Sequence, residues 1–329
     1  MNKRNKNSKP SVIKVLFFGT SDFGIPGLDI VTSLAGFSLI GCVTAPDRPV
    51  GKKQVITPSP VKIWAEKNNI PVSQPERIKN PASIQSIKEL VPDLILVTAY
   101  GQVIPKEILS IPLYGALNIH PSLLPRWRGA APIQYAILEG DSKTGVTLIL
   151  MDEEIDHGSI IAREEMLLSG TETFEGLSGS LQELASKLLE KTLSLWCGKK
   201  ITPVPQNDGD ATYTKILTRQ DGKLNWAKSA EELERQIRAF YPWPGSVTFW
   251  ESDSKDIVKI KVLAGGVLQD SQFRQLSYGQ TFVTRSGDLA VNTGNGALIL
   301  KRLQLESKTP VTSKEFLNGY PRVVGSIFI

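Results

Sequence analysis

Asn118 and His120 are two polar side chains at the end of an apolar run, residues 116–120, whose composition predicts a strand. Because the side chains of a strand alternate between its faces, residues two apart point to the same side. Pro121 removes a ladder donor and predicts that the strand ends there. An amide and an imidazolium side by side can both donate to a developing oxyanion. The pair therefore indicates an oxyanion-stabilising site, with a purely structural histidine as the alternative.

Asp156 belongs to an acidic segment, residues 151–158 (MDEEIDHG), that follows another predicted strand. A carboxylate at this place could orient His120, hold its ring protonated and relay a proton through water. Acid-rich loops are also commonly just solvated, so the segment alone is a weak indication. His157, the other histidine of the chain, adjoins Asp156, which makes a site of two histidines and a carboxylate conceivable for a metal. No further Cys/His cluster supports it, and we expect no metal.

The first predicted turn, residues 19–26 (GTSDFGIP), invites comparison with phosphate-binding loops. Ile25 and Pro26 stand where a P-loop has Lys and Ser or Thr, and the segment lacks the G-x-G-x-x-G pattern. A nucleotide cofactor is therefore disfavoured. We expect a tight turn in which Ser21 or Asp22 caps the following helix.

Two basic segments have the side chains to contact an anion or a nucleic acid. Residues 126–129 (RWRG) combine guanidinium and indole groups, which suit a carboxylate, a phosphate or a base plane. The loop 46–60 holds four prolines and a net positive charge, and a long basic loop inside an ordered domain is typical of a functional segment. A solvated surface loop is the alternative for both. The basic side chains that could make such contacts are Arg48, Lys52, Lys53, Arg126 and Arg128.

Strand and helix patterns alternate through the first 198 residues. This alternation predicts a mostly parallel sheet with helices on both faces, whose ligands bind beyond the carboxyl ends of the strands. Asn118, His120 and the loop with Asp156 occupy such ends. Buried strands are expected at 12–19, 37–45, 93–100, 116–120 and 146–151, and helices at 24–34, 60–68, 84–90, 131–139 and 180–196.

The pattern changes after residue 197. Residues 199–210 contain prolines and glycine without an apolar period, which predicts a linker. A helix at 231–240 and five short strands, at 246–250, 257–263, 281–284, 289–293 and 297–303, are typical of a domain with a small β-barrel or sandwich. The predicted organisation is a flexible basic arm at 1–11, a catalytic domain at 12–198, a linker at 199–216 and a C-terminal domain at 217–329.

Composition places the chain among ordinary globular proteins. Its 329 residues predict two domains, and 41% hydrophobic with 22% charged residues gives no sign of disorder. Two cysteines are too few for a disulfide framework and indicate a reducing compartment. We expect no membrane span and no secretory signal, hence a cytoplasmic protein. The net charge of +5 is a mild lean towards anionic partners, and residues 1–14 alone carry five positive side chains.

Two of these segments together resemble a family signature. Residues 115–138 (GALNIHPSLLPRWRGAAPIQYAIL) and 145–161 (GVTLILMDEEIDHGSII) are similar to that of the 10-formyltetrahydrofolate-dependent formyltransferases. Within the family, nearly the whole chain resembles the branch that acts on initiator methionyl-tRNA. The segments that carry this narrower resemblance are VLFFGTSDFGIPGL (15–28), TAPDRPVGKKQVITPSPVK (44–62), VTAYGQVIP (97–105), ATYTKI (211–216), DGKLNW (221–226), IRAFYPWPG (237–245) and FLNGYPRV (316–323).

The resemblance implies a Rossmann-like α/β domain, an OB-like C-terminal β-barrel, and a catalytic group made of Asn118, His120 and Asp156. The methionine α-amine of initiator methionyl-tRNA would attack the formyl carbon of 10-formyltetrahydrofolate, for translation initiation. Asn118 and His120 would steady the oxyanion, while Asp156 would set the state of His120 and help remove the amine proton. No metal is needed, and a monomer is expected. Folate contacts are expected at Val97, Ala99, Tyr100, Gly101, Ser122, Leu123, Leu124 and Pro125. The tRNA contacts that the resemblance implies are Arg48, Lys52, Lys53, Arg126 and Arg128.

The chain departs from the family at His157, where the usual residue between the catalytic Asp and the following Gly is Thr. The nearest alternative function shares the chemistry but uses an amino sugar nucleotide as acceptor, and the basic loop together with AFYPWPG favours tRNA. Formyltetrahydrofolate hydrolase-type domains and the purine-pathway transformylase match the second domain poorly. A non-catalytic RNA-binding protein would leave Asn118, His120 and Asp156 without a purpose.

Overall fold

The computed structural model describes residues 12–51, 53–251, 256–269 and 275–329. The chain divides into two compact units, one made of residues 1–129, 144–166 and 178–213, the other of 130–143, 167–177 and 214–329. The predicted basic arm and Lys52 lie outside the described residues. Within the described ranges, no helix has the length and apolar character needed to cross a membrane.

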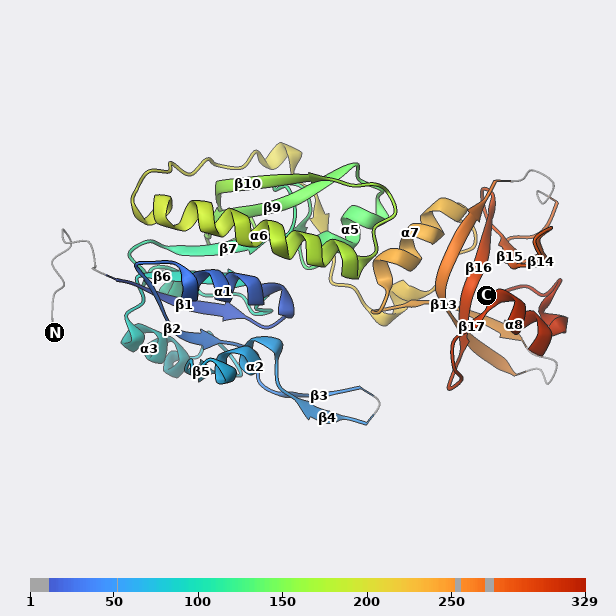
Figure 1. Ribbon diagram of the computed structural model, residues 1–329, viewed down its shortest axis with the longest axis horizontal. Helices are drawn as coiled ribbons and strands as arrows, with labels where there is room; N and C mark the ends of the chain where they lie inside the picture. Colours follow the sequence, from blue (N-terminus) through green and yellow to red (C-terminus); the bar gives the residue numbers. More distant parts are fainter. Residues whose placement is uncertain (1–11, 52, 252–255, 270–274) are drawn as a thin grey trace. The chain divides into compact units, whose positions relative to one another are not determined.

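A seven-stranded sheet forms the centre of the first unit (Figure 1). Neighbouring strands β5, β2, β1, β6 and β7 pair in parallel, whereas β9 runs antiparallel to β7. The chain builds outward from β1 in one direction and then returns to add β6 and β7 on its other side, so the topology switches between β1 and β6. The order is β10 (Ser159–Leu167), β9 (Lys143–Leu150), β7 (Ala116–His120), β6 (Leu94–Thr98), β1 (Ile13–Gly19), β2 (Phe37–Val43) and β5 (Val72–Ser73).

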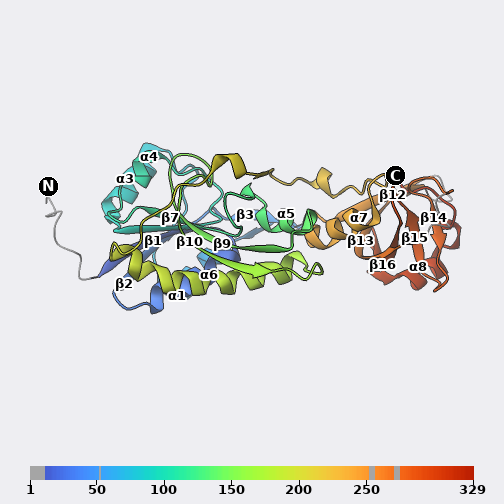
Figure 2. The ribbon, with the colours of Figure 1, turned by 90° about the horizontal axis from the view of Figure 1, so that it is seen from above.

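Helices cover both faces of this sheet (Figure 2). On one face, α3 (Pro81–Leu90) and α4 (Lys106–Leu109) share a core with Leu16 and Phe18 of β1. On the other lie α1 (Ile25–Ser33) and α6 (Phe174–Cys197). The alternation of strand side chains thus gives each face its own apolar layer. The mostly parallel, helix-covered sheet predicted from the sequence is confirmed. Remaining helical elements outside the second unit are η1 (Asp22–Gly24), α2 (Pro60–Lys67) and η2 (Asp208–Asp210).

Two local features differ from the sequence prediction. The predicted loop 46–60 contains a two-stranded antiparallel hairpin of β3 (Arg48–Val50) and β4 (Val55–Thr57). Its prolines predict a loop, so the β-branched run at residues 55–57 was not recognised as a strand. Val55 and Ile56 are exposed, so no apolar alternation marks this strand. Strand β10 was not predicted because it lies at the sheet edge, and charged residues interrupt its apolar pattern.

The second unit contains an antiparallel sheet packed against α7 (Ala230–Phe240). The order is β12 (Ser246–Glu251), β13 (Ile257–Leu268), β16 (Ala297–Leu305), β15 (Leu289–Asn292) and β14 (Thr281–Val283), with β17 (Val311–Thr312) on β16. The remaining helical elements are α5 (Pro132–Leu138), η3 (Arg219–Gly222), α8 (Ser313–Gly319) and η5 (Pro321–Val323).

The C-terminal residues join the two edges of this sheet. Ile329 exchanges two backbone hydrogen bonds with Phe249 of β12, of 2.9 and 3.1 Å. On the other side, the Phe328 N–H donates to the Gly279 oxygen at 2.8 Å, next to β14. Both edges therefore find backbone partners in the same short segment, and the sheet closes into the predicted OB-like barrel.

Candidate active site

Asn118 and His120 lie on β7, where they are 9% and 4% exposed. Parallel β6 places Val97 beside Asn118, and antiparallel β9 places Thr147 beside His120. Both side chains reach the same carboxylate, as the alternation along a strand requires. The flanking strands hold the two functional groups at the carboxyl end of the sheet.

The Asp156 carboxylate lies between these two residues. Its Oδ1 accepts from Asn118 Nδ2 at 3.0 Å, and its Oδ2 accepts from the Gly129 N–H at 2.8 Å. Oδ2 also lies 3.5 Å from His120 Nδ1, and the Asp156 side chain is only 13% exposed. Donors to both oxygens stabilise the ionised carboxylate in a place where water is mostly excluded.

The His120 ring is oriented from its far side by the Trp127 carbonyl, 2.8 Å from Nε2. A carbonyl oxygen only accepts, so Nε2 carries the proton. The other nitrogen, Nδ1, then faces Asp156 and can donate to it when the ring is doubly protonated. This geometry differs from the prediction that His120 donates directly to an oxyanion, because each ring nitrogen is directed at a protein acceptor. Asn118 uses one amide hydrogen on Asp156 and retains the second.

Three non-glycine residues around this group have left-handed backbone: Ala99, Trp127 and Asp156, with φ of 46°, 62° and 51°. Such residues are uncommon and persist where the surrounding structure over-determines them. Ala99 lies directly after β6, Trp127 supplies the carbonyl that orients His120, and Asp156 carries the carboxylate.

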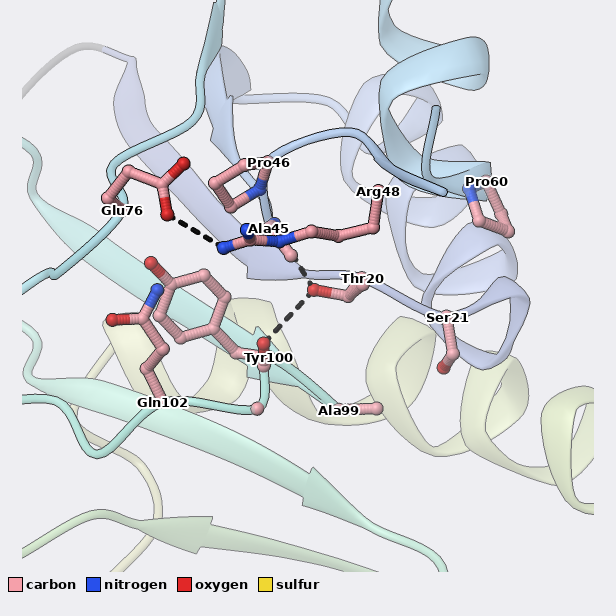
Figure 3. A pocket seen from close by; sticks show the side chains of 11 residues that line it. Thr20, Ser21, Ala45, Pro46, Arg48, Pro60, Glu76, Ala99, Tyr100 and Gln102 are labelled. Carbon is pink, nitrogen blue, oxygen red and sulfur yellow. Dashed lines mark hydrogen bonds and ion pairs between the residues drawn. The ribbon is translucent and has the colours of Figure 1, made fainter. Parts of the chain in front are cut away.

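A cavity of about 680 Å³ opens at the switch between β1 and β6 (Figure 3). The hydroxyl oxygens of Ser21 and Tyr100 are buried here without a hydrogen-bond partner among the described residues. Burial raises the pKa of Tyr100 to about 12, so this phenol stays protonated and can donate. Both residues line the cavity, but their hydroxyl groups are themselves buried beneath its surface. Its lining is Thr20, Ser21, Ala45, Pro46, Arg48, Pro60, Glu76, Ala99, Tyr100, Gly101 and Gln102.

The predicted folate contacts separate into two groups. Ala99, Tyr100 and Gly101 line the cavity, whereas Val97 is a core residue at 5% exposure. The segment 122–125 does not contribute to the lining. In that segment Ser122 and Leu124 are buried, and Leu123 and Pro125 are partly buried.

The predicted tRNA contacts lie in very different surroundings. Arg48 is on the β3–β4 hairpin, with an Nη2–Glu76 Oε2 distance of 2.7 Å and 63% of its side chain exposed. Lys53 and Arg126 are exposed. Arg128, on the short strand β8 (Arg128–Gly129) that pairs with β11 (Tyr213–Thr214), is only 2% exposed. The predicted tRNA contact at Arg128 is therefore wrong, because its guanidinium is buried among protein acceptors.

His157 has different partners from His120. His157 Nδ1 donates to Asp152 Oδ2 at 2.6 Å, and its Nε2 lies 3.5 Å from Asp208 Oδ2. Hydrogen bonding to Asp152 raises the pKa of His157, and hydrogen bonding to Arg128 lowers the pKa of Asp208. Across the part of the chain that is described, no three His, Cys, Asp or Glu side chains are grouped as a metal site would require.

Three groups in this arrangement had no signal in the sequence: the Trp127 carbonyl, the Gly129 N–H and the Gln206 amide, which contacts the Asp156 loop. Backbone groups carry no residue-type signature. Gln206 lies 50 positions from Asp156 in a segment whose composition indicates a linker. The neighbouring residues Pro205 and Asn207 give no chemical reason to select this amide.

Comparison with known proteins identifies the arrangement. A family model described as formyl transferase matches residues 13–193, and one described as formyl transferase, C-terminal domain, matches residues 216–321. The chain belongs to the formyl transferase family. It is 38% identical to the methionyl-tRNA formyltransferase of Methylacidiphilum infernorum over 317 residues, covering 96% of this chain and 98% of the relative. The methionyl-tRNA formyltransferase of Bacillus cytotoxicus is also 38% identical, over 318 residues, covering 95% and 98%.

Solved structures of formyl transferases share the fold. WlaRD, a sugar 3N-formyl transferase crystallised with dTDP and 5-N-formyl-THF, aligns with a TM-score of 0.63 at 17% identity, over 91% of this chain and all of the other. HypX from Aquifex aeolicus, in complex with tetrahydrofolic acid, aligns with a TM-score of 0.60 at 15% identity, over 96% of this chain and 48% of the other. At these identities the likeness supports the formyl transferase fold alone.

Proposed function

We propose that this chain transfers the formyl group of 10-formyltetrahydrofolate to the α-amine of methionine on initiator methionyl-tRNA, for translation initiation. The observation that carries the proposal is the end-to-end similarity, over both domains, to methionyl-tRNA formyltransferases at 35–38% identity. The folate is a co-substrate, and the reaction needs no metal in this proposal. The protein would act as a cytoplasmic monomer.

In the proposed reaction, the amine attacks the formyl carbon and negative charge develops on the formyl oxygen. Asn118 donates its second amide hydrogen to that oxygen, and one such donor is worth ~2.7–4 kcal/mol of barrier lowering. The Asp156–His120 pair receives the amine proton, directly or through one water. The tetrahedral adduct then collapses: the bond between the formyl carbon and N10 breaks, the pair returns the proton to N10, and tetrahydrofolate leaves. The Trp127 carbonyl supports this role because it keeps the ring oriented while the charge on the pair changes.

Substrate placement follows from the cavity at the β1–β6 switch. Ala99, Tyr100 and Gly101 would contact the folate at the end of β6. The segment 122–125 follows β7 outside this lining, and its predicted folate contacts require the ligand to extend beyond the cavity. The acceptor end of the tRNA would meet the hairpin that carries Arg48 and Lys53, and Arg126 offers a further exposed cation. The positive charge and the exposure of these side chains suit phosphate contacts.

An amino sugar nucleotide is the second candidate acceptor. It is supported by the shared fold with WlaRD, a sugar 3N-formyl transferase. That likeness rests on 17% identity, whereas the similarity to the tRNA-directed enzymes reaches 38%. The sequence similarity therefore favours tRNA.

The deciding experiment offers purified protein 10-formyltetrahydrofolate with either methionyl initiator tRNA or a dTDP-linked amino sugar. We expect formyl-methionyl-tRNA as the product, at the same rate before and after treatment of the protein with EDTA. Formylation of the sugar alone would retain the chemistry and overturn the acceptor. Loss of activity after EDTA, restored by a divalent cation, would overturn the metal-free mechanism.

A further inference from the structure

The side chain of Gln206 forms hydrogen bonds with the backbone on either side of His157. Its Nε2 donates to the backbone oxygens of Asp156 and Gly158, both at 2.8 Å. A primary amide has two hydrogens on one nitrogen, so it can satisfy two converging carbonyls at once. Both carbonyls belong to the turn in which Asp156 has its positive φ. Gln206 thus supplies the bonds that fix the strained part of the loop.

The other end of this amide binds Arg128. Gln206 Oε1 accepts from Arg128 Nε at 3.1 Å and from Nη2 at 2.9 Å. Arg128 also donates from Nη2 to Asp208 Oδ1 at 2.8 Å and from Nη1 to the Tyr213 hydroxyl at 3.2 Å. Its backbone N–H donates to the Thr212 oxygen at 2.9 Å. At 2% exposure this cation is held in one position, because a buried guanidinium is costly unless its donors are satisfied.

The two backbone neighbours of Arg128 contact the catalytic pair directly. On one side, the Trp127 oxygen lies 2.8 Å from His120 Nε2. On the other, the Gly129 N–H donates to Asp156 Oδ2 at 2.8 Å. The position of Arg128 therefore sets both an acceptor for the histidine and a donor for the carboxylate, while its side chain fixes Gln206 and hence the Asp156 backbone.

We propose that Gln206 and Arg128 are positioning residues of the reaction: together they set the distance and angle between Asp156 and His120. The expected loss of turnover rests on the proposed formyl transfer. The expected change in the geometry of Asp156 and His120 does not. Neither residue faces the cavity that would hold the substrates. Loss of either should therefore reduce turnover while leaving substrate affinity nearly unchanged.

The test compares Gln206→Glu and Gln206→Leu with Asn207→Ala. Glutamate keeps the Arg128 contact but cannot donate to the two carbonyls, and leucine loses both contacts. Asn207 is the matched control, because the hydrogen bonds that its side chain makes within the described residues are with Gly209 and Asp210 of the same segment. We expect kcat to fall about 100-fold in both Gln206 variants, the loss typical of a misplacement of about 1 Å, with KM for tRNA and folate within about twofold. Wild-type kcat would overturn the proposal, as would a loss confined to KM.

A second measurement is independent of substrates. The chain has two histidines, so the imidazole Cε1–H signals in an NMR titration number two, and a His157→Thr variant assigns them. We expect the titration midpoint of the His120 signal to change in both Gln206 variants. It should stay at its wild-type value in Asn207→Ala. An unchanged His120 signal would overturn the positioning role even where turnover fell. If the wild-type protein formylated no acceptor, the proposed function would fail while this titration still decided the geometry.

Arg128→Lys extends the test, with Gln206→Glu as the variant of choice if the lysine protein does not fold. Lysine retains the charge but not the planar fork that binds Gln206 and Asp208 together. We expect the same result as for the Gln206 variants: kcat falls, while KM for tRNA and KM for folate stay nearly unchanged. A rise in KM for tRNA alone would instead return Arg128 to the nucleic-acid surface and overturn its positioning role.

Discussion

The Asp156 carboxylate has donors on both oxygens and an imidazole at 3.5 Å, and this explains why an isosteric change should be severe. In Asp156→Asn one oxygen becomes an NH2 group, which must then face the Asn118 amide or the Gly129 N–H, both donors. We expect kcat to fall by about 10²–10⁴-fold, the usual contribution of general acid–base catalysis, with the fold retained.

Steady-state kinetics and circular dichroism check this prediction, and Glu154→Gln is the matched control. Glu154 is an exposed acid of the same loop with the same chemistry. Equal turnover in Asp156→Asn and Glu154→Gln would exclude Asp156 from the catalytic group. A loss of folded structure in Asp156→Asn would assign the carboxylate a structural role.

His157 should make stability depend on pH. Its pKa is raised, mainly by the hydrogen bond to Asp152. A histidine whose pKa is higher in the folded state stabilises fully below its unfolded pKa of ~6.5, and this contribution is lost as pH rises through the folded pKa. His157→Thr removes the contribution. The Tm of the wild type should therefore exceed that of His157→Thr most at pH 6, and the difference should shrink towards pH 9. A difference that grows with pH would contradict the assignment.

Sequence patterns located the polar side chains of the site but not the groups that orient them. Asn118 and His120 were recognised because strand alternation has a fixed period of two. Arg128 was assigned to the surface because an arginine is rarely buried, and the folded segment 206–213 supplies partners that allow its burial. Those partners come from residues 78 to 85 positions away in the sequence.

At the scale of elements, the loop after β9 depends on Gly158. A Cβ there would overlap the carbonyl oxygen of Leu150. Backbone cannot move aside as a flexible side chain does, so Gly158→Ala should shift the loop that carries Asp156. We expect destabilisation by about 1–3 kcal/mol, as for other overpacked sites, together with reduced kcat.

Chemical denaturation and kinetics test this, with Gly179→Ala as the control. Gly179 is exposed on α6 and has nothing within 4 Å of an added Cβ. Alanine should stabilise that helix by about 0.5–1 kcal/mol without changing kcat. Gly158→Ala with wild-type stability and turnover would show that the loop accommodates a side chain.

The β3–β4 hairpin should carry the tRNA contact. Arg48 is exposed on it, and its ion-pair partner Glu76 is also exposed, so this ion pair is weak and can exchange for a phosphate. In Arg48→Ala we expect KM for tRNA to rise about tenfold or more, since a charge-assisted hydrogen bond is worth ~1.5–3 kcal/mol. Because Arg48 also lines the cavity, KM for folate can change as well, but by less than KM for tRNA. Lys67→Ala, an exposed cation at the end of α2, is the control. An unchanged KM for tRNA in Arg48→Ala would place the contact elsewhere.

Element prediction succeeded where one apolar layer dictates the pattern. The strand at 116–120 has the bounds expected from its composition. Strand β4 of the hairpin was missed because an exposed strand has no buried face to impose alternation. Strand β10 was missed because its inward-facing residues are mostly only half-buried and include charged side chains. The closing segment of the barrel could not be predicted either: Ile329 pairs with Phe249 through backbone bonds that depend on the completed sheet.

At the scale of the whole molecule, residues 199–213 belong to the first compact unit although their composition indicates a linker. Val204 forms an isolated bridge with Ile160, and Gln206 follows two residues later. Prolines suppress secondary structure in this segment but leave its carbonyls and side chains free to bind the sheet edge and the Asp156 loop. The segment is therefore ordered by tertiary contacts, which no local pattern reports.

Charge distribution across the whole chain yields a prediction about salt. Binding of a polyanion releases counterions, so log(kcat/KM) for tRNA should fall linearly with log[KCl], with a slope of about −0.7 to −0.9 for each phosphate contacted. Four positive side chains lie within residues 1–11, yet the proposed contacts lie on the hairpin of the first unit. We therefore expect deletion of residues 1–11 to leave most of the slope, and Arg48→Ala to reduce its magnitude by about one.

The same titration separates the two acceptors. A tRNA contacts several phosphates, whereas an amino sugar nucleotide offers a single diphosphate and should show a shallow dependence on salt. A slope that disappears with residues 1–11 would move the nucleic-acid contact from the hairpin to the arm. A kcat/KM for tRNA that is independent of salt in the full-length protein would contradict phosphate recognition altogether, and would leave the small nucleotide-linked amine as the acceptor that this cavity and catalytic pair serve.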